Sequence, residues 1–449
     1  MNEPLKHFLE YYERMTPSER KLFLNEIPFA DMVEDWNDLE DQEAMKIFVE
    51  LPLEIKTDLI SELSYQDQEL LILGLSEKSK KNLFQMMEPD DLVDIMQSVN
   101  KEVRDSVWKS LSDDAKREML FLLRFDEDDA AGLMTPRFLA VQAHTSVGQA
   151  INFIRANCNT VEYLFSIYVI DQLERLIGFV DMKYLLAAKD SQKISEILED
   201  KIVYVYEDTD QEEVAKLMDT NDFASIPVIN HEHILIGIVT FDDVIDVIRE
   251  EQTEDVYKMG GMASSTDTYM HNSVWDLVKM RVPWLIILLL LGTVSANVLN
   301  HYESILVGAA FLIIFMPVIT QTGGNAGSQA STLMIRGLAT GEIQFRDVMK
   351  IISKELLIGI IMGVITGGVI ILRSIFLPPG VGVYEGMVIG LSLMIVVFIS
   401  NLIGILAPLG IARLGKDPTV MSAPLMATVI DICGYAIYFE TAKWLLKLS

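Results

Sequence analysis

The chain has 449 residues, of which 50% are hydrophobic, 65 are acidic and 36 are basic, giving a formal net charge of −29. A surplus of this size argues against binding to nucleic acid or to anionic lipid and favours cations as partners. The charge is divided unevenly, because 25 basic and 56 acidic residues precede residue 273, whereas 11 and 9 follow it. One part of the chain is therefore strongly acidic, and the other is apolar and nearly neutral.

The cellular compartment is indicated by the cysteines and by the N-terminus. Cys158 and Cys433 lie far apart, so they form neither a disulfide framework nor a zinc site. The initial segment MNEPLKHFLEYYERM lacks the basic and apolar regions of a signal peptide. We therefore expect the N-terminal region to stay in the cytoplasm.

Residues 1–130 predict an all-α domain of short helices. Apolar residues recur at spacings of three and four, as at Leu92, Ile95 and Met96, which is typical of a helix with one buried face. Helix-start signals divide the segment at TPSER, LPLEI, LSEKS, EPDDL and LSDDA. Recurrent helical units of this kind indicate a superhelical, solenoid-like bundle.

Residues 131–250 change to alternating strands and helices and contain an internal repeat. The segment SIYVIDQLERLIGFVDMKYLL (166–186) aligns without gaps on SIPVINHEHILIGIVTFDDVI (225–245), with 8 of 21 positions identical at a constant offset of 59. Each copy predicts a strand, a polar turn, a second strand ending Ile-Gly-x-Val, and a helix. The pair resembles a tandem of CBS domains, an α/β regulatory module whose two repeats pair.

Residues 251–272 predict a polar, mostly helical connector, and 273–449 predict an all-α membrane domain. Stretches long enough to cross about 30 Å of hydrocarbon indicate five spans, at 280–300, 304–324, 352–378, 383–412 and 418–446. Lys and Arg precede the first span and occupy the connections after the second and fourth, whereas 300–303 and 379–386 have none. The positive-inside rule then predicts a cytoplasmic N-terminus and an extracytoplasmic C-terminus.

Asp431 is the clearest functional candidate, because it lies inside the last predicted span with no other charge for a dozen residues before it. A carboxylate at bilayer depth is costly unless it meets water, a cation or a partner. The alternative is a structural carboxylate paired with a buried base, but the spans offer few bases, and Arg373 lies near an outer end. Pro424 lacks an N–H and is expected to free a backbone carbonyl toward a pore.

The segment PVITQTGGNAGSQAST (317–332) is the second candidate site. Its glycines are poor helix formers, and they alternate with polar residues directly after an apolar span. A broken backbone at membrane depth is tolerated only where it lines a cavity, so the amide of Asn325 is a candidate contact for a hydrated cation. The alternative is an ordinary cytoplasmic loop. In the third span, Gly359, Gly363 and Gly367 recur every four residues, which indicates close helix packing.

Clusters of carboxylates in the soluble region form the third candidate. Asp243, Asp246, Glu250 and Glu254 are spaced by three and four, so they share one helical face. Like charges at this spacing repel, and a divalent cation would relieve the repulsion. Oxygen ligands without His or Cys suit Mg²⁺ or Ca²⁺ rather than zinc. The alternative is a solvated acidic face.

A short motif in the second repeat predicts a nucleotide site. Gly237, Thr240 and Asp243 fit the pattern by which some CBS repeats hold a nucleotide ribose, and the candidate ligand is ATP. The first repeat departs from this pattern, with Asp181 in the Thr position and Tyr184 in the Asp position. We therefore expect at most one half of the pair to bind a nucleotide in this way.

The order of these parts, with the segments PVITQTGGNAGSQASTLMIRGLATGEI and DPTVMSAPLMATVIDICGYAIYF, resembles the MgtE family of magnesium channels over nearly the whole chain. The resemblance implies a superhelical domain at 1–130, a tandem CBS pair at 131–250, a plug helix at 251–272 and a five-helix pore domain at 273–449. It also implies a homodimer in the cell membrane, with the pore on its two-fold axis.

The same resemblance implies roles for individual residues. Asp431 would select hydrated Mg²⁺ in the pore, and Ala427 would contribute its backbone carbonyl. Asn325 and Asp417 would lie along the pore and at its cytoplasmic mouth. The implied sensor carboxylates are Asp90, Asp94, Asp210, Glu212, Glu213, Asp222, Asp243, Asp246, Glu251, Glu254 and Asp255.

The leading hypothesis is a Mg²⁺-selective uptake channel without catalytic chemistry, which cytoplasmic Mg²⁺ closes by bridging carboxylates between domains. Because Mg²⁺ sheds water reluctantly, a selective pore can bind it with its water shell intact. One alternative is a secondary transporter that couples Mg²⁺ or Co²⁺ to Na⁺ or H⁺. Another is a membrane-tethered sensor, although an anchor has no use for an intramembrane carboxylate.

Overall fold

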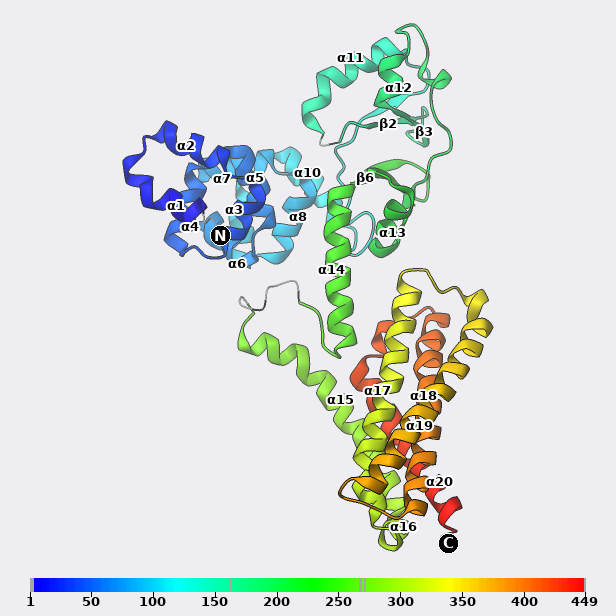
Figure 1. Cartoon of the computed structure of the whole chain (residues 1–449). Helices are drawn as coiled ribbons and strands as arrows, with labels where there is room; N and C mark the ends of the chain where they lie inside the picture. The colour runs from blue at the N-terminus through cyan, green and yellow to red at the C-terminus, as the bar shows by residue number, and fades with distance from the viewer. Residues whose placement is uncertain (1–3, 162, 266–268, 270–271, 448–449) are drawn as a thin grey trace. The chain divides into compact units, whose positions relative to one another are not determined.

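The computed structural model describes residues 4–161, 163–265, 269 and 272–447 (Figure 1). The chain consists of two compact units, residues 1–251 and 252–449. The helix α14, Phe241–Met259, begins in the first unit and ends in the second. The boundary predicted at residue 250 therefore falls inside a continuous helix, because the helical pattern of the second repeat runs on into the connector without a stop signal. The helix ends at Met259, inside the connector predicted at 251–272, of which residues 266–268, 270 and 271 lie outside the described residues.

The first unit begins with a superhelix, as predicted (Figure 1). Each helix packs against the helix two positions along the chain, so odd-numbered and even-numbered helices form two layers. Buried Phe8, Trp36, Phe48 and Phe84 belong to the core of this superhelix. Its helices are α1 Pro4–Tyr11, α2 Pro17–Glu26, α3 Phe29–Trp36, α4 Asp41–Glu50, α5 Leu53–Glu62, α6 Tyr65–Gly74, α7 Glu77–Met86, α8 Pro89–Ser98, α9 Lys101–Ser110 and α10 Asp113–Leu122.

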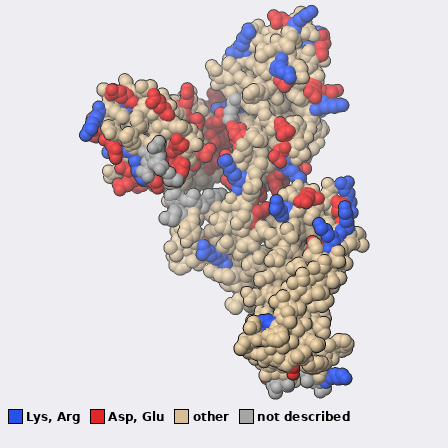
Figure 2. Space-filling model, in the orientation of Figure 1, with Lys and Arg blue, Asp and Glu red and all other residues tan. Residues whose placement is uncertain are grey.

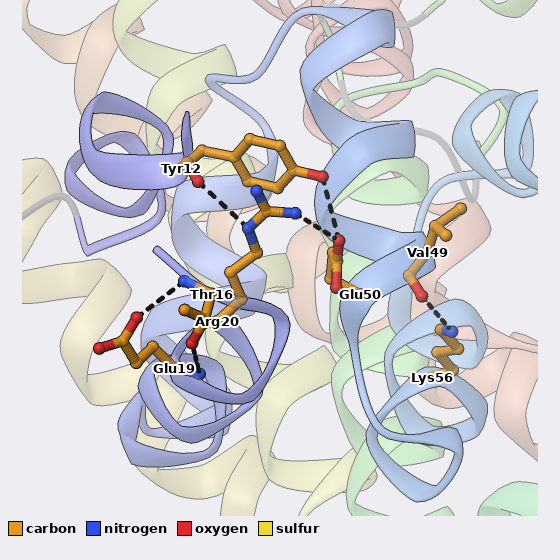
Figure 3. A network of polar contacts seen from close by, with 7 residues as sticks. All are labelled: Tyr12, Thr16, Glu19, Arg20, Val49, Glu50 and Lys56. Atoms are coloured by element: carbon orange, nitrogen blue, oxygen red, sulfur yellow. Dashed lines mark hydrogen bonds and ion pairs between the residues drawn. The ribbon is translucent and has the colours of Figure 1, made fainter. Parts of the chain in front are cut away.

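A polar network fastens α2 to α4 (Figure 3). Thr16 and Glu19 form a capping box that fixes the start of α2. One turn further on, Arg20 donates from Nη1 to Glu50 Oε1 at 3.0 Å, and the Tyr12 hydroxyl donates to the same oxygen at 3.0 Å. Because both charged side chains are mostly buried, this pair contributes more than an exposed ion pair would.

The two repeats form two sheets with the same topology. In each sheet the first two strands are parallel and the last two are antiparallel, in the orders β1-β2-β3 and β4-β5-β6. The tandem α/β pair predicted from the repeat is therefore confirmed. Its elements are β1 Ala140–Gln142, α11 Val147–Asn157, β2 Ser166–Ile170, β3 Leu176–Asp181, α12 Met182–Ala187, β4 Val205–Tyr206, α13 Gln211–Asn221, β5 Ser225–Ile229 and β6 Leu235–Thr240.

The second unit is a bundle of long helices. Four helices in its described residues are long and apolar enough to cross a membrane: α15 Val274–His301, α18 Val348–Phe376, α19 Val383–Arg413 and α20 Ala423–Leu446. Between them lie the short helix α16, Glu303–Gly308, and the 29-residue α17, Phe311–Ala339. On the face seen in Figure 2, the middle of the bundle carries little charge. Four of the five predicted spans are thus matched, although the last helix starts at Ala423 rather than at residue 418.

The helix α17 corrects two predictions. The second span does not begin at residue 304, and the segment 317–332 is neither a broken backbone nor a loop but part of a continuous helix. Its glycines allow close packing: a Cβ on Gly323 would lie 2.7 Å from the Val396 side chain, and one on Gly327 would lie 3.0 Å from the carbonyl of Ser400. The membrane-unit packing offsets the poor helix propensity of these residues.

The glycines of α18 have the packing role predicted for them. A Cβ on Gly363 would lie 2.8 Å from the carbonyl oxygen of Met394, and one on Gly367 would lie 2.7 Å from that of Gly390. The backbone of α19 therefore occupies the space that side chains would need.

Candidate cation sites

Asp431 lies near the middle of α20 and is half-buried. One turn further on, Tyr435 contacts Thr320 of α17. Among the residues that the structure describes, none forms a hydrogen bond or an ion pair with the Asp431 carboxylate. Arg373 instead donates to two backbone carbonyls of the α18–α19 connection, at 3.2 and 3.3 Å. A structural pairing of Asp431 with a base is therefore not found in this part of the chain.

The helix α17 faces α20 through small residues. A Cβ on Gly324 would lie 3.6 Å from Ala427, and the Ser328 hydroxyl donates to the first carbonyl of α20 at 3.3 Å. Asn325 is exposed on the next face of α17, at the level of Ala427. The carbonyl of Ala427 lies inside a regular helix, where it already accepts one intrahelical bond. Pro424 also leaves this helix unbroken, since it lies in the first turn, where no N–H is needed.

Asp417 lies in the connection between α19 and α20, just before the short 3-10 helix Pro418–Val420. Its Oδ1 accepts from the N–H of Thr419 at 2.8 Å, and its Oδ2 lies 3.0 Å from Lys258 Nζ. Although partial burial opposes the effect, these contacts lower the pKa of Asp417 below its usual value. The carboxylate predicted at the cytoplasmic mouth is therefore ionised and paired with a lysine of α14.

Five carboxylates form an acidic cluster in the first unit. Asp90 and Asp91 lie in the first turn of α8, Asp94 one turn on, and Asp243 in the first turn of α14. Burial raises the pKa of Asp90 well above its usual value, and the charges of Asp243 and Asp91 add to the effect. Loss of surrounding water also raises the pKa of Asp91 to about 6 and those of Asp94 and Asp243 to about 7, although the Asp94 side chain keeps an exposed surface on α8. The fifth member is Glu88, which precedes α8.

Two oxygens of this cluster have the properties of vacant cation ligands. Oδ1 of Asp90 and Oε2 of Glu88 are buried without a hydrogen-bond partner among the described residues. A buried oxygen without a partner is costly, and a divalent cation close to the cluster would offset this cost and reverse the pKa shifts. The cluster therefore offers carboxylate oxygens to a cation, and a regulatory Mg²⁺ at this place stays a prediction.

The other predicted sensor carboxylates lie outside this cluster. Asp210 accepts from the N–H of Glu212 at 2.9 Å and caps α13, whereas Asp222 ends that helix with φ +55°. Asp246 bonds to an arginine on its own helix at 2.9 Å, and Glu251 accepts from a glutamine of α13 at 2.7 Å. Two more lie on the surface of α13 and on the part of α14 in the second unit: Glu213 and Asp255.

No complete metal site is assembled in the described residues, since no three His, Cys, Asp or Glu side chains converge closely enough to hold an ion. The full ligand set of the sensor therefore stays a prediction. Glu254 is also occupied, because its carboxylate lies 2.9 Å from Lys258 Nζ.

The residues of the predicted nucleotide motif have neighbours within the chain. Gly237 lies on β6 against Met134, whose Sδ would be 2.5 Å from an added Cβ. Thr240 is buried, and its hydroxyl donates to Asp243, the residue that also belongs to the acidic cluster. Asp243 thus has a competing role, and ribose binding by this motif stays a prediction.

Sequence reasoning missed two residues of these sites. Glu88 opens the run Glu-Pro-Asp-Asp, which is equally typical of an ordinary helix start, where acidic residues are favoured. Lys258 follows Glu254 at a spacing of four, which predicts only a local ion pair. Its second partner, Asp417, lies far along the chain.

The second unit is a bundle of apolar helices with an intramembrane carboxylate that has no partner in the described residues, and the first unit is acidic and contains a CBS pair. Together these features define a regulated membrane transporter of cations. Family models match in the same order: the MgtE intracellular N domain at 27–128, CBS domains at 130–191 and 194–250, and the MgtE divalent cation transporter domain at 316–441.

Relatives cover nearly the whole chain. The magnesium transporter MgtE of Thermus thermophilus is 36% identical over 434 residues, which is 94% of each chain. The magnesium transporter MgtE of Bacillus subtilis is 28% identical and covers 93% of this chain and 92% of its own. The crystal structure of the cytosolic domain of the Mg²⁺ channel MgtE in complex with ATP matches 54% of this chain and 99% of its own, at 32% identity and a TM-score of 0.52. The chain belongs to the MgtE family.

Proposed function

We propose that this chain is a Mg²⁺-selective channel of the cell membrane that mediates magnesium uptake and that cytoplasmic Mg²⁺ closes. The observation that carries the proposal is Asp431, a carboxylate in an apolar helix with no base beside it in the described residues. Such a group is tolerated where it faces water and a cation. In a homodimer with the pore on its two-fold axis, two copies would face one hydrated ion, with Ala427 and Asn325 along the pore.

The domains would act in the order of the chain. In this proposal 1–130 and 131–250 sense Mg²⁺ in the cytoplasm, 251–272 transmits the signal, and 273–449 forms the pore. The match of 27–128 to an intracellular domain supports a cytoplasmic N-terminus. The sequence alternation of basic and base-free connections supports an extracytoplasmic C-terminus.

Closure would follow from the acidic cluster. At low Mg²⁺, like charges at Asp90 and Asp243 disfavour the contact between α8 and α14, whereas a bound ion stabilises it. The ion supplies the positive charge, and the two residues supply oxygens that have lost their water. ATP at the CBS pair is a further proposed ligand, supported by the relative whose cytosolic domain was solved with ATP.

Mg²⁺ flux into proteoliposomes, measured with an internal Mg²⁺ dye, tests the pore. Asp431→Ala and Asp431→Asn should each lower the flux at least tenfold, because the hydrated ion loses its charged contact. Glu440→Gln is the matched control, since Glu440 lies on the same helix but accepts from the Tyr302 hydroxyl at 2.9 Å. Undiminished flux through both Asp431 variants would reject the proposed pore.

The alternative function is coupled transport of a divalent cation. Coupled transport is distinguished from a channel by measuring the same Mg²⁺ flux with and without an imposed Na⁺ or pH gradient. A channel needs only the Mg²⁺ gradient and the membrane potential, so its flux should persist when both other gradients are absent. Flux that stops without one of them would favour the coupled transporter.

A further inference from the structure

Lys258 forms ion pairs with two carboxylates from different parts of the second unit. Its Nζ lies 2.9 Å from Glu254 Oε1, one turn earlier on α14, and 3.0 Å from Asp417 Oδ2 in the α19–α20 connection. About two-thirds of its side chain is shielded, since 32% is exposed. Burial lowers the pKa of Lys258, but the two carboxylates outweigh it and raise the pKa above its usual value. The ammonium group is thus permanently charged.

The segment after Lys258 fixes its position. α14 ends at Met259, and Gly261 then turns the chain at φ +70°, where an added Cβ would collide with the indole of Trp284 on α15. Two residues later, the N–H of Ala263 donates to the carbonyl of Met280 at 3.1 Å. The hydrogen bond and the close approach of Gly261 to Trp284 hold the end of α14 against α15, so the position of Lys258 does not depend on the ion pair alone.

We propose that Lys258 is a positioning residue of the gate, which bridges Glu254 and Asp417 as a divalent cation would and so holds the end of α14 at the α19–α20 connection without bound Mg²⁺. This role rests on the proposed closure by Mg²⁺, to which it adds a contribution from the chain itself. The ammonium group of Lys258 attracts both carboxylates, whereas without it Glu254 and Asp417 repel each other. Part of the closed arrangement is then supported by the chain itself, and this sets how much Mg²⁺ closure requires.

The test is a Mg²⁺ titration of flux through the full chain in proteoliposomes, with each variant normalised to its own maximal flux. Lys258→Met should raise the half-closing Mg²⁺ concentration by about two- to fivefold, the range of a partly exposed ion pair. Lys258→Arg should restore the wild-type midpoint. The control is Lys279→Met, because Lys279 forms only an exposed local pair with Asp276 at 2.8 Å, and it should leave the midpoint unchanged.

A second variant separates the bridge from a general loss of structure. Adding Asp417→Asn to Lys258→Met removes the repulsion between the bare carboxylates, so the midpoint should move part of the way back toward wild type. A double variant that closes less readily than Lys258→Met would reject the bridge. A Lys258→Met midpoint equal to or below that of wild type would also overturn it. If wild-type flux does not respond to Mg²⁺, the proposed function fails first, whatever the variants do.

Discussion

Lowering the pH from 8 to 6 should weaken the response of the first unit to Mg²⁺, because protons and Mg²⁺ compete for the acidic cluster. Asp94 and Asp243 have pKa values of about 7, and Asp91 has a value of about 6. At pH 8 a carboxyl with a pKa of 7 is about nine-tenths ionised, and at pH 6 only about one-tenth. Each such ligand therefore costs about tenfold in apparent Mg²⁺ affinity, and two together cost up to about a hundredfold.

The stability of the unit without Mg²⁺ should change in the opposite direction. A carboxyl whose pKa is raised in the folded protein stabilises the fold when protonated, so this contribution is complete below the unfolded value of about 4 and is lost as the pH rises through about 7. In EDTA the contact between α8 and α14 should thus be stronger at pH 6 than at pH 8. With saturating Mg²⁺ the order should reverse, because the ion replaces the protons.

Limited proteolysis of the full-length protein in detergent, across a Mg²⁺ series at both pH values, measures this competition. The half-protecting Mg²⁺ concentration should rise by about 10- to 100-fold at pH 6. Asp243→Asn should lower this pH ratio by about tenfold, since it removes one of the titrating groups, whereas Asp113→Asn, at an exposed position on α10, should leave it unchanged. Equal midpoints at pH 6 and pH 8 would show that these carboxylates are not the Mg²⁺ ligands.

Two further predictions concern the frameworks that hold the sites. Gly363→Val should lower the melting temperature of the detergent-solubilised protein, because overpacking against α19 costs about 1–3 kcal/mol of unfolding free energy. Gly368→Val is the control and should not lower it, since nothing lies within 4 Å of a Cβ added there. Equal losses of stability in the two variants would contradict the packing role. Arg20→Met leaves the mostly buried Glu50 without its cation, so it should lower the unfolding free energy of the first unit in chemical denaturation by about 1–3 kcal/mol. Arg117→Met, at an exposed ion pair, is the control. A loss of stability in Arg20→Met no larger than that in Arg117→Met would refute the role of the buried pair.

Features that repeat or lie close together in sequence could be predicted. The 59-residue offset predicted two equivalent strand pairs, and the structure repeats even their details. Both antiparallel pairs shift register at matching positions, after Val169 and after Val228. Glu174 and His233, also 59 apart, both adopt positive φ, at +61° and +63°. The two turns, 171–175 and 230–234, share no residue, so the common geometry follows from the repeated strand–turn–strand pattern rather than from identical side chains.

Features that depend on the environment or on distant contacts could not be predicted. The glycines of 317–332 indicated a broken backbone because helix propensities describe peptides in water, whereas a membrane helix must satisfy its backbone internally. The acidic residues of the soluble region look alike in sequence, yet Oδ1 of Asp90 is buried and Glu213 is exposed. Which carboxylates lose their water is decided by the packing of α8 against the rest of the first unit, and no local pattern records it.

The supply of positive charge connects the sites. Of the carboxylates that the structure describes, some have a cation from the chain: Arg20 serves Glu50, and Lys258 serves Asp417. The cation of each pair belongs to the chain, so its supply does not change with the Mg²⁺ concentration. Asp90, whose Oδ1 is buried, and half-buried Asp431 receive no such cation in the described residues. With 65 acidic and 36 basic residues the chain cannot neutralise every carboxylate. A carboxylate without a cation from the chain is free to bind Mg²⁺, so its occupancy follows the Mg²⁺ concentration. A carboxylate that is already paired does not bind Mg²⁺, but its ion pair influences how much Mg²⁺ closure requires.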